Sequence, residues 1–253
     1  MRTYRTRVAL LAASLLLTGC GGGLAASPDS RPGGTASDGA PTATPGAPAP
    51  GGTAGAGTRE IPGLGPKTRA AVPATARQVV VAAGRGRDSP LSTVVLYHRT
   101  ADGWQAGTAW PAHNALRGWT DRHLVGDLRS PTGVYGLTDA GGRLPDPGAK
   151  LPYDRSARGF VAPGTGFEGE PLAGAFDYVV AINYNREPGT SPLDWTRPLG
   201  AERGGGIWIH VDHGGPTHGC VSIAEPHMRD LLRTLDPALR PVVVMGDRDW
   251  LAR

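Results

Sequence analysis

The clearest pattern along the chain is a series of short apolar runs separated by loops rich in glycine and proline. Runs of this length, rich in β-branched residues and bounded by turn residues, are typical of β-strands. The predicted strands are QVVVAA (78–83), STVVLYHR (92–99), GWQAGTAW (103–110), TGVYGLTD (132–139), DYVVAINYN (177–185), IWIHV (207–211) and PVVVMG (241–246). The pattern therefore predicts a strand-rich domain.

One segment has the periodicity of a helix instead. In EPHMRDLLRTLDP (225–237), Pro226 suits the first helical turn, and four apolar residues recur at helical spacing. These are Met228, Leu231, Leu232 and Leu235. We expect this stripe to pack against the sheet.

The N-terminus has the pattern of an export signal. Three arginines precede Val8–Leu17, an apolar run of ten residues, which is shorter than the about 20 residues needed to span a bilayer. The run ends in LLTGC (16–20), which resembles the bacterial lipobox. This resemblance implies a signal peptide at 1–19, cleavage before Cys20 and a lipid on its sulfur; the alternative is an ordinary secretory signal with a chance cysteine.

The segment after Cys20 has almost no apolar side chains. Within residues 21–57, only Leu24, Asp29, Arg31 and Asp38 are not Gly, Ala, Ser, Thr or Pro. Such a composition cannot bury enough apolar surface to offset the entropy of ordering. We therefore predict a disordered tether over 20–68 and a single domain over 69–253.

The net charge and the number of cysteines argue against nucleic-acid binding and against a disulfide. Removing residues 1–19 removes three arginines and no acid, so 23 basic and 22 acidic residues remain, a net charge of +1. Without a basic block, nucleic acid is not an expected partner. The chain has two cysteines, so a lipidated Cys20 leaves Cys220 without a disulfide partner.

The chemistry-bearing residues gather in GGGIWIHVDHGGPTHGCVSI (204–223). Strand alternation puts Trp208 and His210 on one face of IWIHV. A nearby imidazole turns a thiol into a nucleophile, and a short turn can bring Cys220 to His210. Gly219 permits unusual backbone angles, and the amides of residues 219 and 220 suit an oxyanion. The alternative for a lone thiol is a small buried apolar side chain.

The strand His210 followed by Thr217-His218-Gly219-Cys220 resembles the hallmark of the L,D-transpeptidase, or YkuD-type, catalytic domain of bacterial cell walls. The segments SPTGVYGLTDAGGRLPDPG (130–148), KLPY (150–153) and VVAINYN (179–185) are similar to its actinobacterial branch. The resemblance covers most of residues 78–246. It implies a mainly β, sandwich-like domain with a short C-terminal helix.

The resemblance also implies a reaction. Cys220 would attack a peptidoglycan stem tetrapeptide with His210 as the base, while Thr217, His218 and Gly219 shape the oxyanion loop. D-Ala would leave a thioester, and an amine of a second stem would then form a 3→3 cross-link; attack by water would make the enzyme an L,D-carboxypeptidase. No cofactor is implied, and the lipid would hold the enzyme at the extracytoplasmic face of the membrane, within reach of the wall.

The chain departs from the family two residues after the cysteine, where many members have arginine and this sequence has Ser222. Arg186 or Arg203 is a candidate for holding the donor carboxylate instead. Residues considered for a substrate groove are Trp208, Asn183, Tyr184 and Ser222.

Three other functions compete with this interpretation. A zinc site would draw on His210, Asp212, His213, His218 and Cys220, but the metal-binding spacings H-E-x-x-H and C-x-x-C are absent, so no metal is expected. In papain-like peptidases the histidine follows the cysteine, the reverse of the order here. A non-catalytic wall-binding lipoprotein of the same fold is the third alternative.

Overall fold

The strands of the domain join into one long curled sheet. The computed structural model describes residues 57–253, so the predicted signal peptide, Cys20 and most of the predicted tether lie outside the described residues. The ten-stranded sheet has the order β6-β12-β1-β2-β3-β11-β10-β9-β7-β8, and β4 and β5 form a separate pair. The strands are β1 (Gln78–Gly84), β2 (Leu91–Thr100), β3 (Gly103–His113), β4 (Trp119–Thr120), β5 (Ser130–Pro131), β6 (Gly133–Gly136), β7 (Ala140–Gly142), β8 (Tyr153–Arg155), β9 (Val179–Ala181), β10 (Trp208–Val211), β11 (Val221–Ile223) and β12 (Val242–Asp247). The prediction of a mainly β fold is confirmed.

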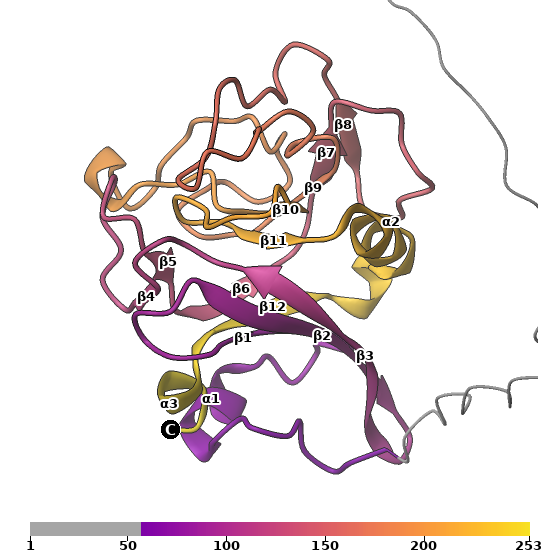
Figure 1. The fold of residues 1–253 in the computed structure, drawn as a ribbon. Helices are drawn as coiled ribbons and strands as arrows, with labels where there is room; N and C mark the ends of the chain where they lie inside the picture. Colours follow the sequence, from indigo (N-terminus) through magenta and orange to yellow (C-terminus); the bar gives the residue numbers. More distant parts are fainter. Residues whose placement is uncertain (1–56) are drawn as a thin grey trace, which may run out of the picture. The chain divides into compact units, whose positions relative to one another are not determined.

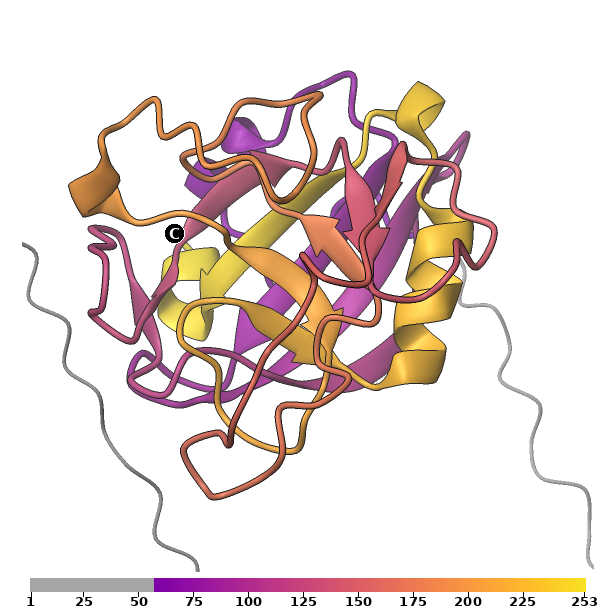
Figure 2. The same cartoon turned by 90° about the horizontal axis from the view of Figure 1, so that it is seen from above.

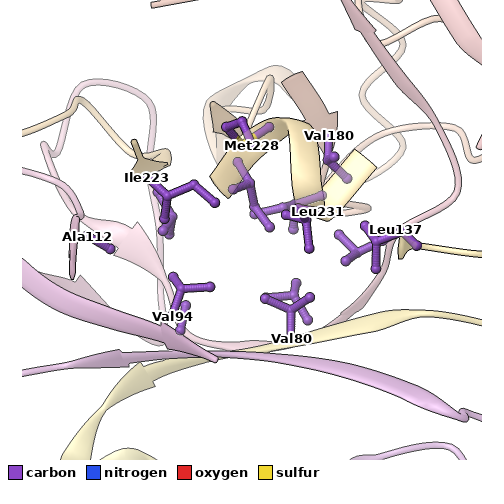
Figure 3. Close-up of a cluster of buried hydrophobic side chains, with 14 of the residues drawn as sticks. Val80, Val94, Ala112, Leu137, Val180, Ile223, Met228 and Leu231 are labelled. Atoms are coloured by element: carbon purple, nitrogen blue, oxygen red, sulfur yellow. The ribbon is translucent and has the colours of Figure 1, made fainter. Parts of the chain in front are cut away.

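Curling brings the two halves of the sheet face to face, which gives the sandwich-like form (Figure 1). Strands β1, β2 and β12 form one layer, β9, β10 and β11 form the other, and α2 (Glu225–Thr234) closes one side between them. Figure 3 shows Val80 and Val94 of the first layer facing Ile223 and the helix residues Met228 and Leu231. All five side chains are completely buried, so this shared core holds the two layers in place.

The central strand β1 is apolar on both faces because both faces are covered. It pairs in parallel with β12 and antiparallel with β2. Val80 faces the core between the layers, whereas Val79 and Val81 face a second apolar cluster on the outer side of the sheet. A strand buried on both faces reads as a continuous apolar run, as QVVVAA does.

Two short helices cover the outer face, α1 (Pro66–Ala71) and α3 (Arg248–Leu251). Residues 57–68, which the sequence analysis assigned to the tether, pack here as part of the domain. Thr58 and Trp104 exchange two backbone hydrogen bonds of 2.9 and 2.6 Å, and Ile61 and Leu64 are buried at 3% exposure each. The domain therefore includes residues 57–68, which the composition had assigned to the tether.

The predicted C-terminal helix is present as α2, with the expected apolar stripe. Met228, Leu231, Leu232 and Leu235 are all fully buried in the main core. The chain leaves the helix at Leu235, whose backbone is extended, and a single 3-10 turn η2 (Pro237–Leu239) follows. Another 3-10 turn, η1 (Ala201–Arg203), precedes β10. Within residues 57–253, no helix is long and apolar enough to cross a bilayer.

Candidate active site

The site residues lie on two neighbouring parallel strands, β10 and β11. His210 is in register with Ser222, and Cys220 immediately precedes β11. Because side chains alternate along strands, Trp208, His210 and Cys220 share the face that points away from the main core. Accordingly, Trp208 and Cys220 belong to a small outer cluster with Phe160. Local sequence thus places imidazole and thiol on one surface.

The imidazole of His210 is buried and has a defined tautomer. Its Nδ1 lies 2.9 Å from the carbonyl oxygen of Val211, and because that oxygen can only accept, Nδ1 carries the proton. Nε2 is therefore the atom left to accept a proton. Burial lowers the pKa of His210 to about 4, so the ring is neutral at pH 7. Phe176 packs edge-on against it, with ring centroids 5.4 Å apart.

The thiol of Cys220 is held by two backbone groups. The N–H of Trp208 donates to Sγ over 3.4 Å, and Sγ lies 3.6 Å from the carbonyl oxygen of Gly206. Burial raises the pKa of Cys220 to about 11, against the opposing effect of the Trp208 amide. The residue keeps some exposure, where it borders a pocket. Within residues 57–253 no hydrogen bond joins Cys220 to His210, so the resting pair is a neutral thiol and a neutral imidazole.

Hydrogen bonds of Thr217 fix the loop that precedes Cys220. Its hydroxyl donates to the Cys220 carbonyl over 2.7 Å, and its N–H donates to the carbonyl of Asn114 over 3.0 Å. Among residues 57–253, the backbone N–H groups of His218, Gly219 and Cys220 donate to no protein acceptor. Three free amides beside a thiol are suited to an oxyanion.

The structure corrects the expected reason for Gly219. Its φ is outside the left-handed region, so it needs no unusual backbone angle. A Cβ at this position would instead lie 2.9 Å from Cδ1 of Ile207. The glycine is required for space, because the loop packs tightly on the residue that precedes β10.

A second loop, residues 156–178 between β8 and β9, lies beside the site loop (Figure 2). Glu170 accepts from Nδ1 of His213 at 3.1 Å, and Phe167 packs on the exposed His218 with ring centroids 4.6 Å apart. His213 in turn stacks on His210, with centroids 5.8 Å apart. The side chain of His213 is therefore buried and paired with Glu170.

Ser222 belongs to a polar cluster next to His210. Its hydroxyl donates to Asp212 Oδ1 over 2.7 Å, and Nδ1 of His113 lies 2.9 Å from the same oxygen. Burial raises the pKa of Asp212, but the hydrogen bonds from Ser222 and His113 outweigh it and hold the pKa below its usual value. Ser222 is fully buried, so it does not line a groove as expected.

A pocket of about 360 Å³ opens beside the thiol. Its lining includes His218, Gly219 and Cys220 of the site loop, together with Trp195 and Arg197. The sequence analysis missed Trp195 and Arg197, because they lie in a long loop with no periodic pattern. Trp208 does not line this pocket but packs behind Cys220 in the outer cluster.

Two further residues expected in the groove lie elsewhere. Asn183 bonds to Thr138 over 3.0 Å and accepts from Arg186 over 2.6 Å. Tyr184 is buried, and its hydroxyl donates to the carbonyl of Arg203 over 2.9 Å. Neither residue borders the pocket at Cys220. The apolar strand ends at Ala181, earlier than predicted. Asn183 and Tyr184 therefore lie in the loop after it, where the contacts described above fix their side chains.

The residues weighed for zinc are not gathered into a ligand set. Within the described part of the chain, no three His, Cys, Asp or Glu side chains are close enough together to hold a metal ion. His213 and Asp212 are engaged instead with Glu170 and His113, respectively.

Comparison with known proteins adds one specific match. The family model described as YkuD, L,D-transpeptidase catalytic domain, matches residues 105–244, which include His210 and Cys220. No curated protein matches the chain. Among solved structures, the one titled "Structure of Bdellovibrio bacteriovorus Bd1075" is 14% identical with a TM-score of 0.34, covering 67% of this chain and 47% of that one. The chain thus spans about half the length of that structure.

Proposed function

The chain belongs to the YkuD family of L,D-transpeptidase catalytic domains, and we propose that it is a cysteine-dependent peptidoglycan transpeptidase with Cys220 as nucleophile and His210 as base. The observation that carries the proposal is a neutral His210, with its proton on Nδ1, on the same face of the sheet as the thiol. Peptidoglycan stem peptides are the proposed substrates.

In the first half-reaction, Sγ of Cys220 attacks the carbonyl carbon of the third stem residue. The thiol proton passes to Nε2 of His210 as the S–C bond forms, because a resting thiolate is disfavoured by burial. The carbonyl oxygen becomes an oxyanion, for which the amides of residues 218–220 are suitable donors. When the C–N bond breaks, His210 returns the proton to the departing amine of D-Ala, which leaves a thioester.

In the second half-reaction, a side-chain amine of another stem attacks the thioester carbonyl. His210 accepts a proton from that amine and passes it to the sulfur as the C–S bond breaks. The product is a 3→3 cross-link, and the neutral thiol and imidazole are restored. If water takes the place of the amine, the same steps release a tripeptide, and the enzyme is an L,D-carboxypeptidase.

The reaction is tested by incubating the purified full-length chain with a disaccharide tetrapeptide and analysing products by mass spectrometry. A cross-linked dimer that lacks one D-Ala is expected, and it should be absent with Cys220→Ala and His210→Ala. His98→Gln, a histidine change on β2, is the matched control and should leave the product yield unchanged. Tripeptide alone would favour the carboxypeptidase. Absence of both products would leave a non-catalytic wall-binding protein.

The location of the enzyme is also proposed. A lipid on Cys20 would anchor the chain at the extracytoplasmic face of the cell membrane, and the segment after it would let the domain reach the wall. Metabolic labelling with a fatty acid analogue tests this, because Cys20→Ala should lose the label and release the protein from the membrane fraction. Label retained by Cys20→Ala would rule out the lipid anchor at this residue.

A further inference from the structure

The pocket beside Cys220 has an apolar surface with one strong cation. Its lining includes Val125, Leu128 and Trp195. Among residues 57–253, Arg197 is the sole Lys or Arg side chain in this lining, and no Asp or Glu belongs to it. An acyl donor that reaches Sγ occupies this space, so any permanent charge that the pocket recognises in the donor is negative.

Backbone carbonyls hold Arg197 in place, and within residues 57–253 it makes no direct ion pair. Its Nη1 donates to the backbone carbonyls of Asp194 and Thr196 at 3.0 and 2.9 Å. The guanidinium carbon lies 4.8 Å from the ring centre of Trp195, a cation–π distance. Within residues 57–253, no carboxylate lies within 4.0 Å of this guanidinium, and the Asp194 carboxylate is used by the N–H of Thr196. Nε and Nη2 are therefore free to donate.

Two consecutive glycines contact Arg197 and the thiol, respectively. At Gly205, where φ is +151°, an added Cβ would lie 2.1 Å from Nε of Arg197, so the guanidinium rests directly on bare backbone. The neighbouring Gly206 supplies the carbonyl that lies 3.6 Å from Sγ of Cys220. Gly205, which packs against the guanidinium, and Gly206, which contacts the thiol, are therefore adjacent in the chain.

Arg186 and Arg203, the other candidates for binding the donor carboxylate, do not lie in this pocket. Arg186 is 6% exposed and bonds to Asp139 Oδ2 at 2.8 Å, so its charge is already paired inside the protein. Arg203 does not line the pocket. Ser222, at the position where many family members have arginine, is turned to Asp212.

We propose that Arg197 binds a carboxylate of the donor stem peptide and makes Cys220 selective for anionic donors. This inference rests on the proposed function. The terminal carboxylate of the tetrapeptide is three bonds from the carbonyl carbon that Sγ attacks, at most about 4 Å away, so a donor bound at Sγ places it in the pocket that Cys220 and Arg197 both line. A carboxylate on the third residue is the other possible source. A guanidinium can hold either one through two parallel hydrogen bonds.

The first test measures kcat and KM of the full-length chain with three donors: the free tetrapeptide, its terminal carboxamide, and a tetrapeptide amidated on the third residue. With Arg197→Gln, KM for the free tetrapeptide should rise about 10- to 100-fold, the range for a lost charged hydrogen bond. KM for the donor that lacks the bound carboxylate should not change, which identifies the source. Arg197→Lys should recover part of the loss, because it keeps the charge but not the fork.

A second test does not depend on turnover. Iodoacetate and iodoacetamide alkylate the same thiol, but only iodoacetate carries a carboxylate. The ratio of their rates at Cys220, followed by peptide mass spectrometry, should fall at least about threefold in Arg197→Gln, because a cation near the thiol attracts the anionic reagent. Arg203→Gln is the matched control and should keep the wild-type ratio.

The two tests separate the inference from the function. If the wild type turns over the tetrapeptide but Arg197→Gln changes neither KM nor the alkylation ratio, the role of Arg197 is overturned and the transpeptidase stands. If no donor is turned over but the ratio still falls, the proposed function fails while carboxylate recognition at the thiol stands. Should Arg197→Gln not fold, Arg197→Lys and the preference of the wild type among the three donors decide the question.

Discussion

The backbone N–H of Trp208 donates to Sγ of Cys220 over 3.4 Å, so the nucleophile candidate is fastened to the strand that carries His210. The thiol also faces the carbonyl of Gly206 at 3.6 Å, an acceptor that favours the protonated sulfur. With burial opposing the thiolate, the site rests in its neutral form. The proton must then move during attack, rather than before it.

The first prediction concerns the titration of this thiol. Since burial raises the pKa of Cys220 to about 11, its alkylation by iodoacetamide should accelerate about tenfold per pH unit from pH 7 to beyond pH 10. In the urea-unfolded chain the rate should level off above the ordinary pKa of about 8.5. A plateau in the folded protein below pH 8 would contradict the neutral pair and indicate a resting thiolate–imidazolium pair.

The second prediction concerns stability in acid. Burial lowers the pKa of His210 to about 4, compared with about 6.5 when unfolded, so between these values the unfolded chain binds more protons. The stability that the neutral, buried His210 provides is therefore fully present above pH 6.5 and is lost as the pH falls toward 4. Between pH 7.5 and pH 5, the wild type should lose about 2 kcal/mol more unfolding free energy than His210→Gln does.

Urea unfolding of both proteins at the two pH values measures this difference. The comparison with the variant isolates the contribution of the imidazole at position 210. Equal losses in wild type and His210→Gln would mean that His210 is not buried in its neutral form.

The third prediction concerns the carboxylate that joins Ser222 and His113. Asp212→Asn should lower the unfolding free energy at pH 7 by about 1–2 kcal/mol, because the charged acceptor shared by Ser222 and His113 becomes a neutral amide oxygen, which accepts weaker hydrogen bonds. Since the pKa of Asp212 is depressed, its contribution exists above its unfolded pKa and disappears as pH falls through the folded value. The difference between the variant and the wild type should therefore shrink at pH 3.

A double-mutant cycle with Ser222→Ala isolates the hydrogen bond between Asp212 and Ser222. The two changes should be non-additive by at least about 0.5 kcal/mol, as for groups in direct contact. Strict additivity would show that the Ser222 hydroxyl contributes nothing through Asp212.

The fourth prediction tests why residue 219 is glycine. Gly219→Ala should cost about 1 kcal/mol or more, because its Cβ meets Cδ1 of Ile207 at 2.9 Å. Ile207→Val removes that methyl group, so Gly219→Ala should cost less in the Ile207→Val background. Gly86→Ala is a matched control, since its added Cβ meets nothing within 4 Å. Thermal unfolding of the wild type, the two single variants and the double variant measures the coupling. An equal cost of Gly219→Ala in both backgrounds would argue against the packing explanation.

Features that depend on nearby residues could be predicted from the sequence. Alternation along IWIHV put Trp208 and His210 on one face, and a short turn returned Cys220 to the neighbouring strand. The apolar stripe of the C-terminal helix likewise marked its buried side. These predictions succeeded because strand and helix periodicity depend on backbone geometry within a few residues.

What only the tertiary structure decided depends on contacts between distant segments. Thr58 joins the domain by pairing with Trp104, 46 positions later, and Glu170 reaches His213 from a loop 43 positions earlier. Arg197 packs on Gly205 and lines the same pocket as the thiol, while Arg186, closer to an apolar strand in sequence, forms an ion pair with Asp139. Irregular loops carry no periodic signal, because side chains that the rest of the fold places against them determine their course.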